Sequence, residues 1–597
     1  MTVPRDAVAV EYRWDEVGVF PTVEAWEVEL EAVLADLSAL AAFQGRLDES
    51  ASVLVAALHT RDDLAGRADR VFVYALLGYA VETSNPAAVA RFGRAQAAEA
   101  RVRAATAFVD PEVLALGAEL LHVWSAAEPA LVVYEHYVAD LIRCAGHIRS
   151  AEVEEVLGLV SDAFSGPFAV YSALVDSDVV FAAAVPEVDG ESVEVTQGSI
   201  DALLASPERT LRRGAWESYA DGYIGVRNAL AANLASTIKQ AVFSTRVRRH
   251  ASPLASSLAT SNVPIEVFDS LIAAFEANLP TWHRYWRLRR AIGGGEQFAT
   301  YDIAAPLGVS SPVLRYEQCV EWVCASLAPL GDPYVDTVRR GCLEERWVDV
   351  YPTAGKMGGA FSAGAPGTAP FIVMNFDGTA ASLGTLAHEL GHSMHSYLVW
   401  QSQPRVYSRY SIFAAEVASN FHQALLRAYL FEAVDDPALQ LAVLEEAMAN
   451  FYRYFFVMPT LARLERELHE RVERGEGLTA ELLGERTADL FAEGFGPDVE
   501  LDRERLGITW AQFPHLYEPF YVYQYATGIS GAHALARGVL DGETGAAERY
   551  LEFLSAGDSV YPLDGLRRAG VDLTSPEPVE EAFAVLASLV DRIEQLA

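Results

Sequence analysis

The sequence is poor in cysteine and has no long apolar run. Its 597 residues include only four cysteines, and none of them forms a Cys-x-x-Cys pattern. We therefore expect a disulfide-free cytoplasmic protein. No apolar run reaches the roughly 18 residues that a transmembrane helix needs, and the charged first residues lack the apolar core of a signal peptide. The four cysteines are Cys144, Cys319, Cys324 and Cys342.

Positive charge is also scarce. The chain has 45 Lys and Arg against 82 Asp and Glu, a formal net charge of −37. An acidic surface of this size repels nucleic acids and anionic membranes, so we expect neither as a partner. A generally solvated acidic surface explains the charge more simply than a specific acidic site, although it favours cationic substrates.

Apolar residues, in contrast, are plentiful and follow a helical pattern. They make up 51% of the chain, enough for a large interior and for two or more subdomains. Three- and four-residue spacing predicts successive helices from about residue 22 to 180, again from about 199 to beyond 290, and, after a glycine-rich stretch at about 351–377, to the C-terminus. Between the first two, residues 185–196 read as a short hairpin about Asp189-Gly190. We therefore expect an N-terminal helical domain at 1–198 and a second domain at 199–597.

The stretch His388-Glu389-Leu390-Gly391-His392 carries the strongest chemical signal. On a helix, residues four apart share a face, so His388 and His392 can direct two imidazoles at one zinc ion. Glu389 is rotated by about 100° around the axis and can take a proton from a water on the metal. The alternative is an amphipathic helix with two incidental histidines, but a buried histidine pair needs polar partners, and a metal is one.

A zinc site needs a third ligand, and Glu416 is the better of two candidates. His395 lies about 10 Å along the helix axis from His388, which favours a second-shell or packing role. Glu416 is a single acid among small and apolar residues of a second helix, which is costly unless it is paired or bound to a metal. One turn further, Asn420 can accept the outer N–H of a ligand imidazole. An ordinary carboxylate at a helix start is the alternative for Glu416.

A short apolar run precedes the metal motif and reads as a strand. It comprises Phe371, Ile372, Val373, Met374 and Asn375, and continues to Phe376. An exposed edge of this strand can pair with an extended peptide, so we consider it a candidate substrate strand. A purely structural sheet is an equally good interpretation.

Near the C-terminus, His515 and four tyrosines crowd into eleven residues. Phenol and imidazole donors can stabilise the oxyanion that develops during hydrolysis. Tyr521 and Tyr525, with Tyr517, share one face of a predicted helix, and Tyr523 lies off it. Taken alone, such an aromatic stripe is more often part of a core.

These motifs together resemble the oligoendopeptidase F family, bacterial relatives of thimet oligopeptidase. The matching segments follow the family order from about residue 199 to the C-terminus, and the N-terminal helices match more loosely. The segments are 355–361, 371–376, 388–397, 413–419 and 515–528.

The resemblance implies a mostly helical, two-lobed zinc metallopeptidase. Its small β-sheet would lie beside the metal helix, and residues 1–198 would form one wall of a deep substrate channel. It also implies one zinc per chain held by His388, His392 and Glu416, with Glu389 as the base. His515 and one or more of Tyr521, Tyr523 and Tyr525 would hold the transition state.

The implied activity is hydrolysis of internal bonds in short, unstructured oligopeptides. Met357, where Arg or Lys is expected, and His422-Gln423, where Asn-Glu is usual, depart from the family pattern and leave the substrate preference open. One alternative is a carboxypeptidase or aminopeptidase on the same scaffold. A second is an inert helical metal-binding protein, but such a site usually has four protein ligands and no spare base.

Overall fold

The computed structural model describes residues 3–187, 190–293, 297–308 and 312–596, which are mostly helical with one small sheet. Contacts between Cα atoms divide the chain into two compact units. Unit 1 comprises Met1–Ile148, Val313–Leu430 and Leu535–Gly570. Unit 2 comprises Arg149–Pro312, Phe431–Ala534 and Val571–Ala597. The mostly helical fold with a small sheet confirms the expected fold class.

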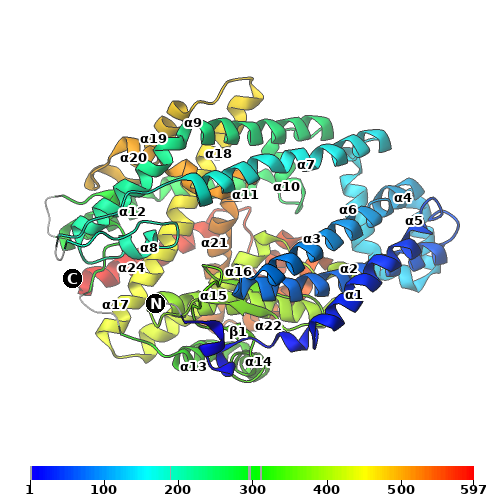
Figure 1. Cartoon of the computed structure of the whole chain (residues 1–597), viewed down its shortest axis with the longest axis horizontal. Coiled ribbons are helices and arrows are strands. Elements are labelled where there is room, and N and C mark those ends of the chain that lie inside the picture. Colours follow the sequence, from blue (N-terminus) through cyan, green and yellow to red (C-terminus); the bar gives the residue numbers. More distant parts are fainter. Residues whose placement is uncertain (1–2, 188–189, 294–296, 309–311, 597) are drawn as a thin grey trace. The chain divides into compact units, whose positions relative to one another are not determined.

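Unit 1 contains the sheet and the metal motif (Figure 1). Its elements are α1 (Val23–Ala41), α2 (Ala51–Val81), α3 (Pro86–Thr106), α4 (Val109–Leu116), α5 (Ala118–Ala127), α6 (Glu135–Cys144), α13 (Tyr316–Ser326), α14 (Asp332–Leu343), β1 (Val348–Asp349), β2 (Phe361–Ala363), β3 (Phe371–Val373), α15 (Ala380–Ser402), most of α16 (Ile412–Ala433), α22 (Ala546–Ala556) and α23 (Pro562–Ala569).

Unit 2 is helical in its described residues (Figure 1). Its elements are α7 (Ala151–Ala173), α8 (Ile200–Leu204), α9 (Arg209–Arg248), α10 (Pro253–Ala259), α11 (Ile265–Ala277), α12 (Leu279–Ile292), α17 (Pro437–Tyr452), α18 (Met458–Glu473), α19 (Ala480–Phe495), α20 (Arg503–Gly507), most of α21 (Tyr523–Leu540) and α24 (Glu577–Leu596).

Both units are discontinuous in sequence, and the chain passes between them at 148/149, 312/313, 430/431, 534/535 and 570/571. The expected division at 198/199 is not a boundary between these units. An antiparallel bridge between Ala184 and Val193 closes the base of the predicted hairpin. Part of its turn, at 188–189, lies outside the described residues. The role of 1–198 as a channel wall stays a prediction.

The first three helices form one side of the unit 1 core, and they lie side by side (Figure 1). Thr22, Ser50 and Asn85 cap α1, α2 and α3 by accepting hydrogen bonds from backbone N–H groups, as small polar residues do at helix starts. Their apolar faces join a cluster that also includes Phe371 and Val373 of β3. The core of unit 1 is therefore made by segments almost 300 residues apart.

The sheet has the order β1-β3-β2. Ile372 of β3 pairs with Val348 of β1 in parallel and with Ser362 of β2 antiparallel. Because β3 is the central strand, its backbone groups already have partners on both sides. The expectation that an incoming peptide pairs with Phe371, Ile372 and Val373 is therefore wrong. Its extension to Met374 and Asn375, beyond the end of β3, stays a prediction. Strands β1 and β2 are both edges of the sheet; the residues of β1 are buried, whereas those of β2 are only half-buried.

The start of α15 is fixed by a turn and a cap. Gly378 has φ +81°, and a Cβ there would lie 3.0 Å from the carbonyl oxygen of Leu314. Thr379 and Ser382 then form a reciprocal capping box. This sequence of turn and cap carries the chain from β3 directly into the metal helix.

None of the described helices combines the length and the apolar character needed to cross a membrane.

Candidate metal centre and aromatic cluster

Three side chains of unit 1 converge in a compact group. The nearest ligand atoms of His388, His392 and Glu416 all lie within 4.8 Å of one another. The Nε2 atoms of the two histidines are 3.2 Å apart. The Glu416 oxygens lie 3.8 Å from Nε2 of His388 and 3.9 Å from Nε2 of His392. The structure thus brings together the three residues that the sequence predicted as ligands.

These separations suit one zinc ion. Ligands about 2.0–2.1 Å from zinc in tetrahedral geometry lie roughly 3.3–3.4 Å apart, close to the observed spacings. Burial, with the neighbouring histidines acting in the same direction, holds the pKa of His392 far below its ordinary value. The neutral imidazole that results is the form that binds metal. The donor set therefore fits zinc, and the described residues supply three ligands to this group, which leaves the fourth position of a tetrahedral site open.

A glycine allows the two ligand-bearing helices to touch. Gly391 lies between the two histidines on α15, and a Cβ there would come within 2.5 Å of the carbonyl oxygen of Ala418 and 2.6 Å of the Cα of Ser419. Both atoms belong to α16, three residues at most beyond Glu416. The close approach of the two backbones therefore sets the distance between Glu416 and the histidines.

Glu389 has a buried carboxylate oxygen that accepts no hydrogen bond from the described residues. Its side chain is buried, and Oε2 has no hydrogen-bond partner among the described residues. Burial, with Glu416 adding to it, raises the pKa of Glu389 to about 7, against the opposing effects of His388 and a hydrogen bond from the Ser362 backbone. A carboxylate with this pKa can accept and release a proton near neutral pH.

The residue that orients a ligand imidazole is Gln423 rather than Asn420. Nδ1 of His388 donates to Oε1 of Gln423 over 3.1 Å, and this contact makes Nε2 the nitrogen that would bind a metal. Asn420 instead donates to the backbone oxygen of Glu416, and its own Oδ1 has no partner among the described residues. The predicted contact of Asn420 with an imidazole is wrong. Gln423 follows Glu416 by two helical turns and Asn420 by one, so the spacing makes both residues candidates and does not choose between them.

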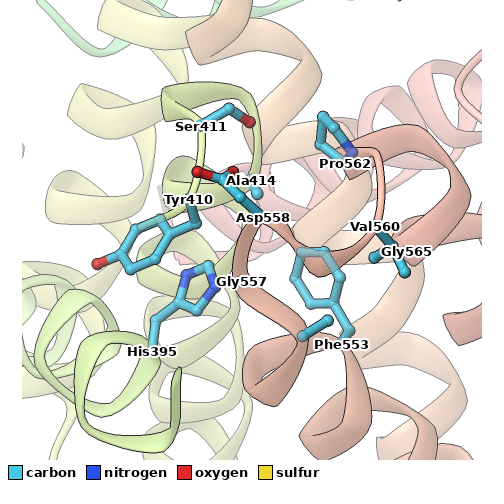
Figure 2. Close-up of a pocket in the computed structure, with 11 residues that line it drawn as sticks. His395, Tyr410, Ser411, Ala414, Phe553, Gly557, Asp558, Val560, Pro562 and Gly565 are labelled. Carbon is cyan, nitrogen blue, oxygen red and sulfur yellow. The ribbon is translucent and has the colours of Figure 1, made fainter. Parts of the chain in front are cut away.

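His395 packs against aromatic rings and is not part of the ligand group. Its ring stacks on Tyr410 with centroids 3.7 Å apart. Figure 2 shows both rings at the wall of a small pocket that Phe553 also lines. The hydroxyl of Tyr410 is hydrogen-bonded to Ser396 over 2.7 Å. His395 therefore supports the metal helix from the side, as a packing residue.

The aromatic cluster near the C-terminus lies in unit 2. Nε2 of His515 and the hydroxyl of Tyr525 are 3.3 Å apart, and the ring of Tyr521 stacks on His515 with centroids 5.6 Å apart. Burial, and to a smaller extent Arg453, lower the pKa of His515 to about 4. His515 is therefore neutral at physiological pH and can donate from one nitrogen only.

Tyr523 does not belong to this cluster. It is 3% exposed, and its ring packs against Phe268 with centroids 5.5 Å apart. The stretch is also not one helix, because a 3-10 helix ends at Tyr517 and α21 begins only at Tyr523. Pro519 and the positive φ of Phe520 occupy the break. The predicted shared helix face of Tyr517, Tyr521 and Tyr525 is therefore wrong, although Tyr521 and Tyr525 still meet.

Comparison with known proteins decides the family. Residues 202–585 match the description "Peptidase family M3", and residues 112–181 match "Oligopeptidase F". The chain belongs to peptidase family M3. The resemblance found in the sequence is confirmed.

Relatives of this M3 family member match it along nearly its whole length. Oligopeptidase PepF of Bacillus subtilis is 35% identical over 99% of this chain and 88% of its own. A putative peptidase from Chlamydophila abortus has a similar solved structure, with a TM-score of 0.88, 28% identity and full coverage of both chains. Oligoendopeptidase-F from Enterococcus faecium gives a TM-score of 0.76 at 29% identity, over 96% of this chain and 99% of its own.

Proposed function

We infer that this M3 peptidase is a zinc-dependent endopeptidase that hydrolyses internal bonds of short, unstructured oligopeptides. The observation that carries the inference is the compact group of two half-buried histidines, His388 and His392, and the buried Glu416, close in sequence to Glu389, whose Oε2 has no hydrogen-bond partner among the described residues. A catalytic zinc site has three protein ligands and one open position. Family membership makes the chain a metallopeptidase, and the donor set argues for zinc.

His388, His392 and Glu416 would hold the ion, and Glu389 would move the proton. Zinc bound there would polarise the scissile carbonyl and lower the pKa of a water towards about 7. Oε2 of Glu389 accepts the proton of the attacking water and then delivers it to the leaving amine. The raised pKa of Glu389 suits both steps, because a much stronger acid would not hold the proton long enough to transfer it.

Donors from the aromatic cluster would serve the developing oxyanion. The hydroxyls of Tyr521 and Tyr525 and the N–H of His515 are the donors that this part of the chain offers, and Tyr523 is not among them. We assign them this role because phenol and imidazole donors stabilise charge that appears only in the transition state.

Strand β2 is the edge to which a peptide backbone would pair. The backbone of Ser362 acts to lower the pKa of Glu389, and its hydroxyl lies 2.8 Å from that of Ser393 on α15. Pairing through the backbone tolerates many side chains and requires an extended substrate. We therefore expect cleavage of flexible peptides at several sequences and survival of folded proteins.

The deciding experiment is cleavage of a quenched internal peptide with and without a chelator, with the products identified by mass. Internal cleavage that chelation stops and zinc restores supports the proposal. Release of single terminal residues would instead show an exopeptidase, and no cleavage by the zinc-loaded protein would favour an inert metal site. We also place the enzyme in the cytoplasm, in keeping with the free thiols of its four cysteines.

A further inference from the structure

A second buried carboxyl group, that of Glu465 on α18, has no cation beside it among the described residues. Its side chain is 2% exposed. Oε1 accepts one hydrogen bond, from the backbone N–H of Phe520 over 2.6 Å, and Oε2 has no partner among the described residues. Burying a carboxyl group with so little compensation is costly. The cost calls for an explanation in the segment that this carboxyl group holds.

That segment is the break between His515 and α21. Phe520 has φ +58°, in the left-handed region that residues with a Cβ seldom adopt. Its ring is buried between His469, with centroids 4.7 Å apart, and Phe268, with centroids 6.1 Å apart. The hydroxyl of Ser257 holds the neighbouring carbonyl of Pro519 over 3.0 Å. The break is therefore fixed in one strained conformation by contacts from α10, α11 and α18.

The strained residue comes directly before Tyr521. Left-handed backbone at Phe520 reverses the chain, so that the ring of Tyr521 stacks on His515 and packs edge-to-face on Tyr525, with centroids 5.6 Å apart in each case. A different conformation at Phe520 would carry the Tyr521 side chain elsewhere. Strain kept by surrounding contacts is a common way of preparing a reactive geometry.

We propose that Glu465 is a positioning residue, which fixes the Tyr521 phenol for transition-state stabilisation by holding the N–H of Phe520. The proposal rests on the proposed function, because it assumes that Tyr521 acts in hydrolysis. Glu465 touches neither substrate nor metal in this scheme. It acts through one backbone hydrogen bond and the residue that follows.

The test compares Glu465→Met, which keeps length but removes the acceptor, with Glu465→Gln, which keeps a carbonyl oxygen in place. We expect Glu465→Met to lower kcat at least tenfold with little change in KM, towards the loss caused by Tyr521→Phe. Glu465→Gln should stay within about threefold of the unmodified enzyme, because its amide oxygen can still accept from Phe520. Thr460→Val, which removes another buried polar group of α18 without contact to the break, serves as the control.

A double variant separates positioning from general damage. If Glu465 acts through Tyr521, Glu465→Met should add almost nothing to Tyr521→Phe, whereas independent effects would multiply. Hydrogen exchange at the Phe520 amide gives a readout without activity: fast in Glu465→Met and slow in Glu465→Gln. If Glu465→Met does not fold, Ser257→Ala takes its place, with the same non-additivity at a smaller size.

The outcomes distinguish the positioning role of Glu465 from the proposed function on which it rests. An unchanged kcat in folded Glu465→Met would overturn the positioning role of Glu465 alone. So would decreases in kcat that multiply when Glu465→Met and Tyr521→Phe are combined. An unchanged kcat in Tyr521→Phe, in an enzyme that cleaves peptides, would overturn the role of Tyr521 as a donor and with it the positioning role of Glu465. Absence of cleavage by the zinc-loaded enzyme would reject the proposed function itself.

Discussion

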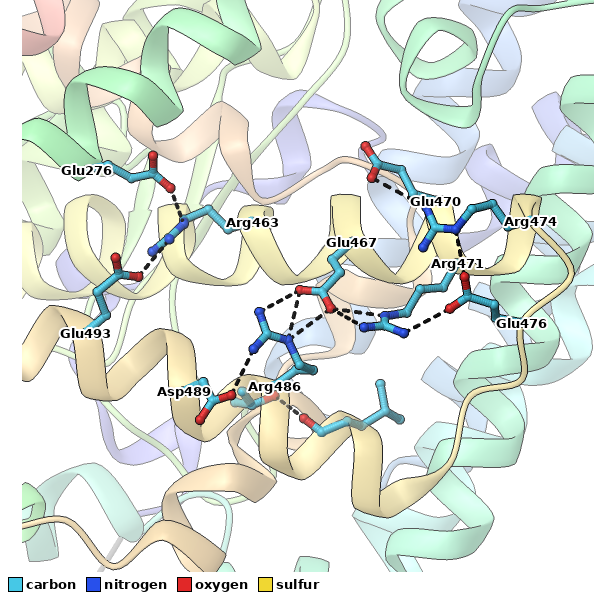
Figure 3. A network of polar contacts seen from close by, with 12 residues as sticks. Glu276, Arg463, Glu467, Glu470, Arg471, Arg474, Glu476, Arg486, Asp489 and Glu493 are labelled. Atoms are coloured by element: carbon cyan, nitrogen blue, oxygen red, sulfur yellow. Dashed lines mark hydrogen bonds and ion pairs between the residues drawn. The ribbon is translucent and has the colours of Figure 1, made fainter.

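The acids of the metal cluster and those on the surface of α18 and α19 differ in what faces them. On the surface, Glu467 receives hydrogen bonds from both Arg471 and Arg486 within a chain of ion pairs (Figure 3). Burial alone would raise the pKa of Glu467, but the two arginines outweigh it and lower the pKa. In the cluster, burial raises the pKa of Glu389 and of Glu416, and no arginine in the described part of the chain opposes it.

The comparison teaches how to read an acidic chain. With 82 acidic residues, the presence of a carboxylate says little. A carboxylate shared between arginines at a partly exposed site contributes modestly to stability. A buried carboxyl group with no cation beside it raises the free energy of the fold, and it is a candidate for metal binding, for proton transfer or, as proposed for Glu465, for holding a strained backbone. The environment of an acid therefore separates the acids of surface ion pairs from those that need a functional explanation.

Removing a ligand acid should have the largest effect. Glu416→Ala leaves two imidazoles for the metal, so we expect zinc to fall from about one per chain to near zero on dialysis, with loss of peptide cleavage. Glu467→Ala should keep its zinc, because it breaks only surface ion pairs. Elemental analysis of both variants makes the measurement, and undiminished zinc in Glu416→Ala would refute the ligand assignment.

Changing the base should abolish turnover without releasing the metal. Glu389→Gln keeps the shape but cannot take a proton, so we expect kcat to fall by about 10²–10⁴ while zinc and peptide binding persist. Near-normal turnover in the zinc-loaded variant would show that another group is the base.

The backbone contact at Gly391 should matter less than the ligands but more than any surface site. In Gly391→Ala the new Cβ pushes α15 from α16, and we expect zinc affinity to fall about 10–100-fold, as when groups that orient metal ligands are disturbed. Gly93→Ala on α3 is the matched control, because a Cβ there meets nothing within 4 Å. Equal zinc affinity in the two variants would contradict the explanation.

The smallest expected effect is on stability. The pH dependence of stability should have opposite signs for two glutamates of α18, Glu465 and Glu467. Burial raises the pKa of Glu465 to about 8 from an ordinary 4.5, so its favourable contribution is complete below pH 4.5 and is lost as the pH rises through 8. The new side chain in Glu465→Gln does not titrate. The melting temperature of this variant should therefore increase relative to that of the unmodified chain as the pH rises from 5 to 8.

Glu467→Gln provides the opposite sign. The ion pairs of Glu467 with its arginines stabilise the fold above the ordinary pKa of a glutamate and are lost in acid. The free energy of unfolding of this variant should therefore fall furthest below that of the unmodified chain at neutral pH, by about 1 kcal/mol or less. Thermal unfolding across this pH range measures both variants. Parallel pH profiles for the two would show that the contrast in environment has no energetic consequence.

The sequence anticipates the parts of the site that depend on short-range spacing. His388, Glu389 and His392 follow from the helical repeat, and Glu416 from an acid among apolar neighbours. Long-range pairing was not predictable. β1 has two residues and β2 three, too few for an alternating pattern, so nothing in the sequence indicated that β3 is central. Phe520 broke the predicted C-terminal helix because tertiary contacts hold a backbone conformation that its residue type disfavours.

The two discontinuous units were equally hidden, because periodicity identifies helices but not their partners. Gln423 rather than Asn420 reached His388 for a similar reason: both lie near the correct face of α16, and only the packing against α15 decides between them. The sequence thus specified the chemistry of the site, and the contacts between distant segments specified its support.

The core that joins α1–α3 to β3 has a consequence for biosynthesis. Translation at about 5–20 residues per second needs roughly 15–55 s to make the roughly 270 residues between Ala98 and Phe371. Throughout that interval the apolar faces of the nascent N-terminal helices lack β3, the strand that completes their core. We therefore expect a fragment ending at residue 198 to expose the apolar faces of these helices and to aggregate rather than fold.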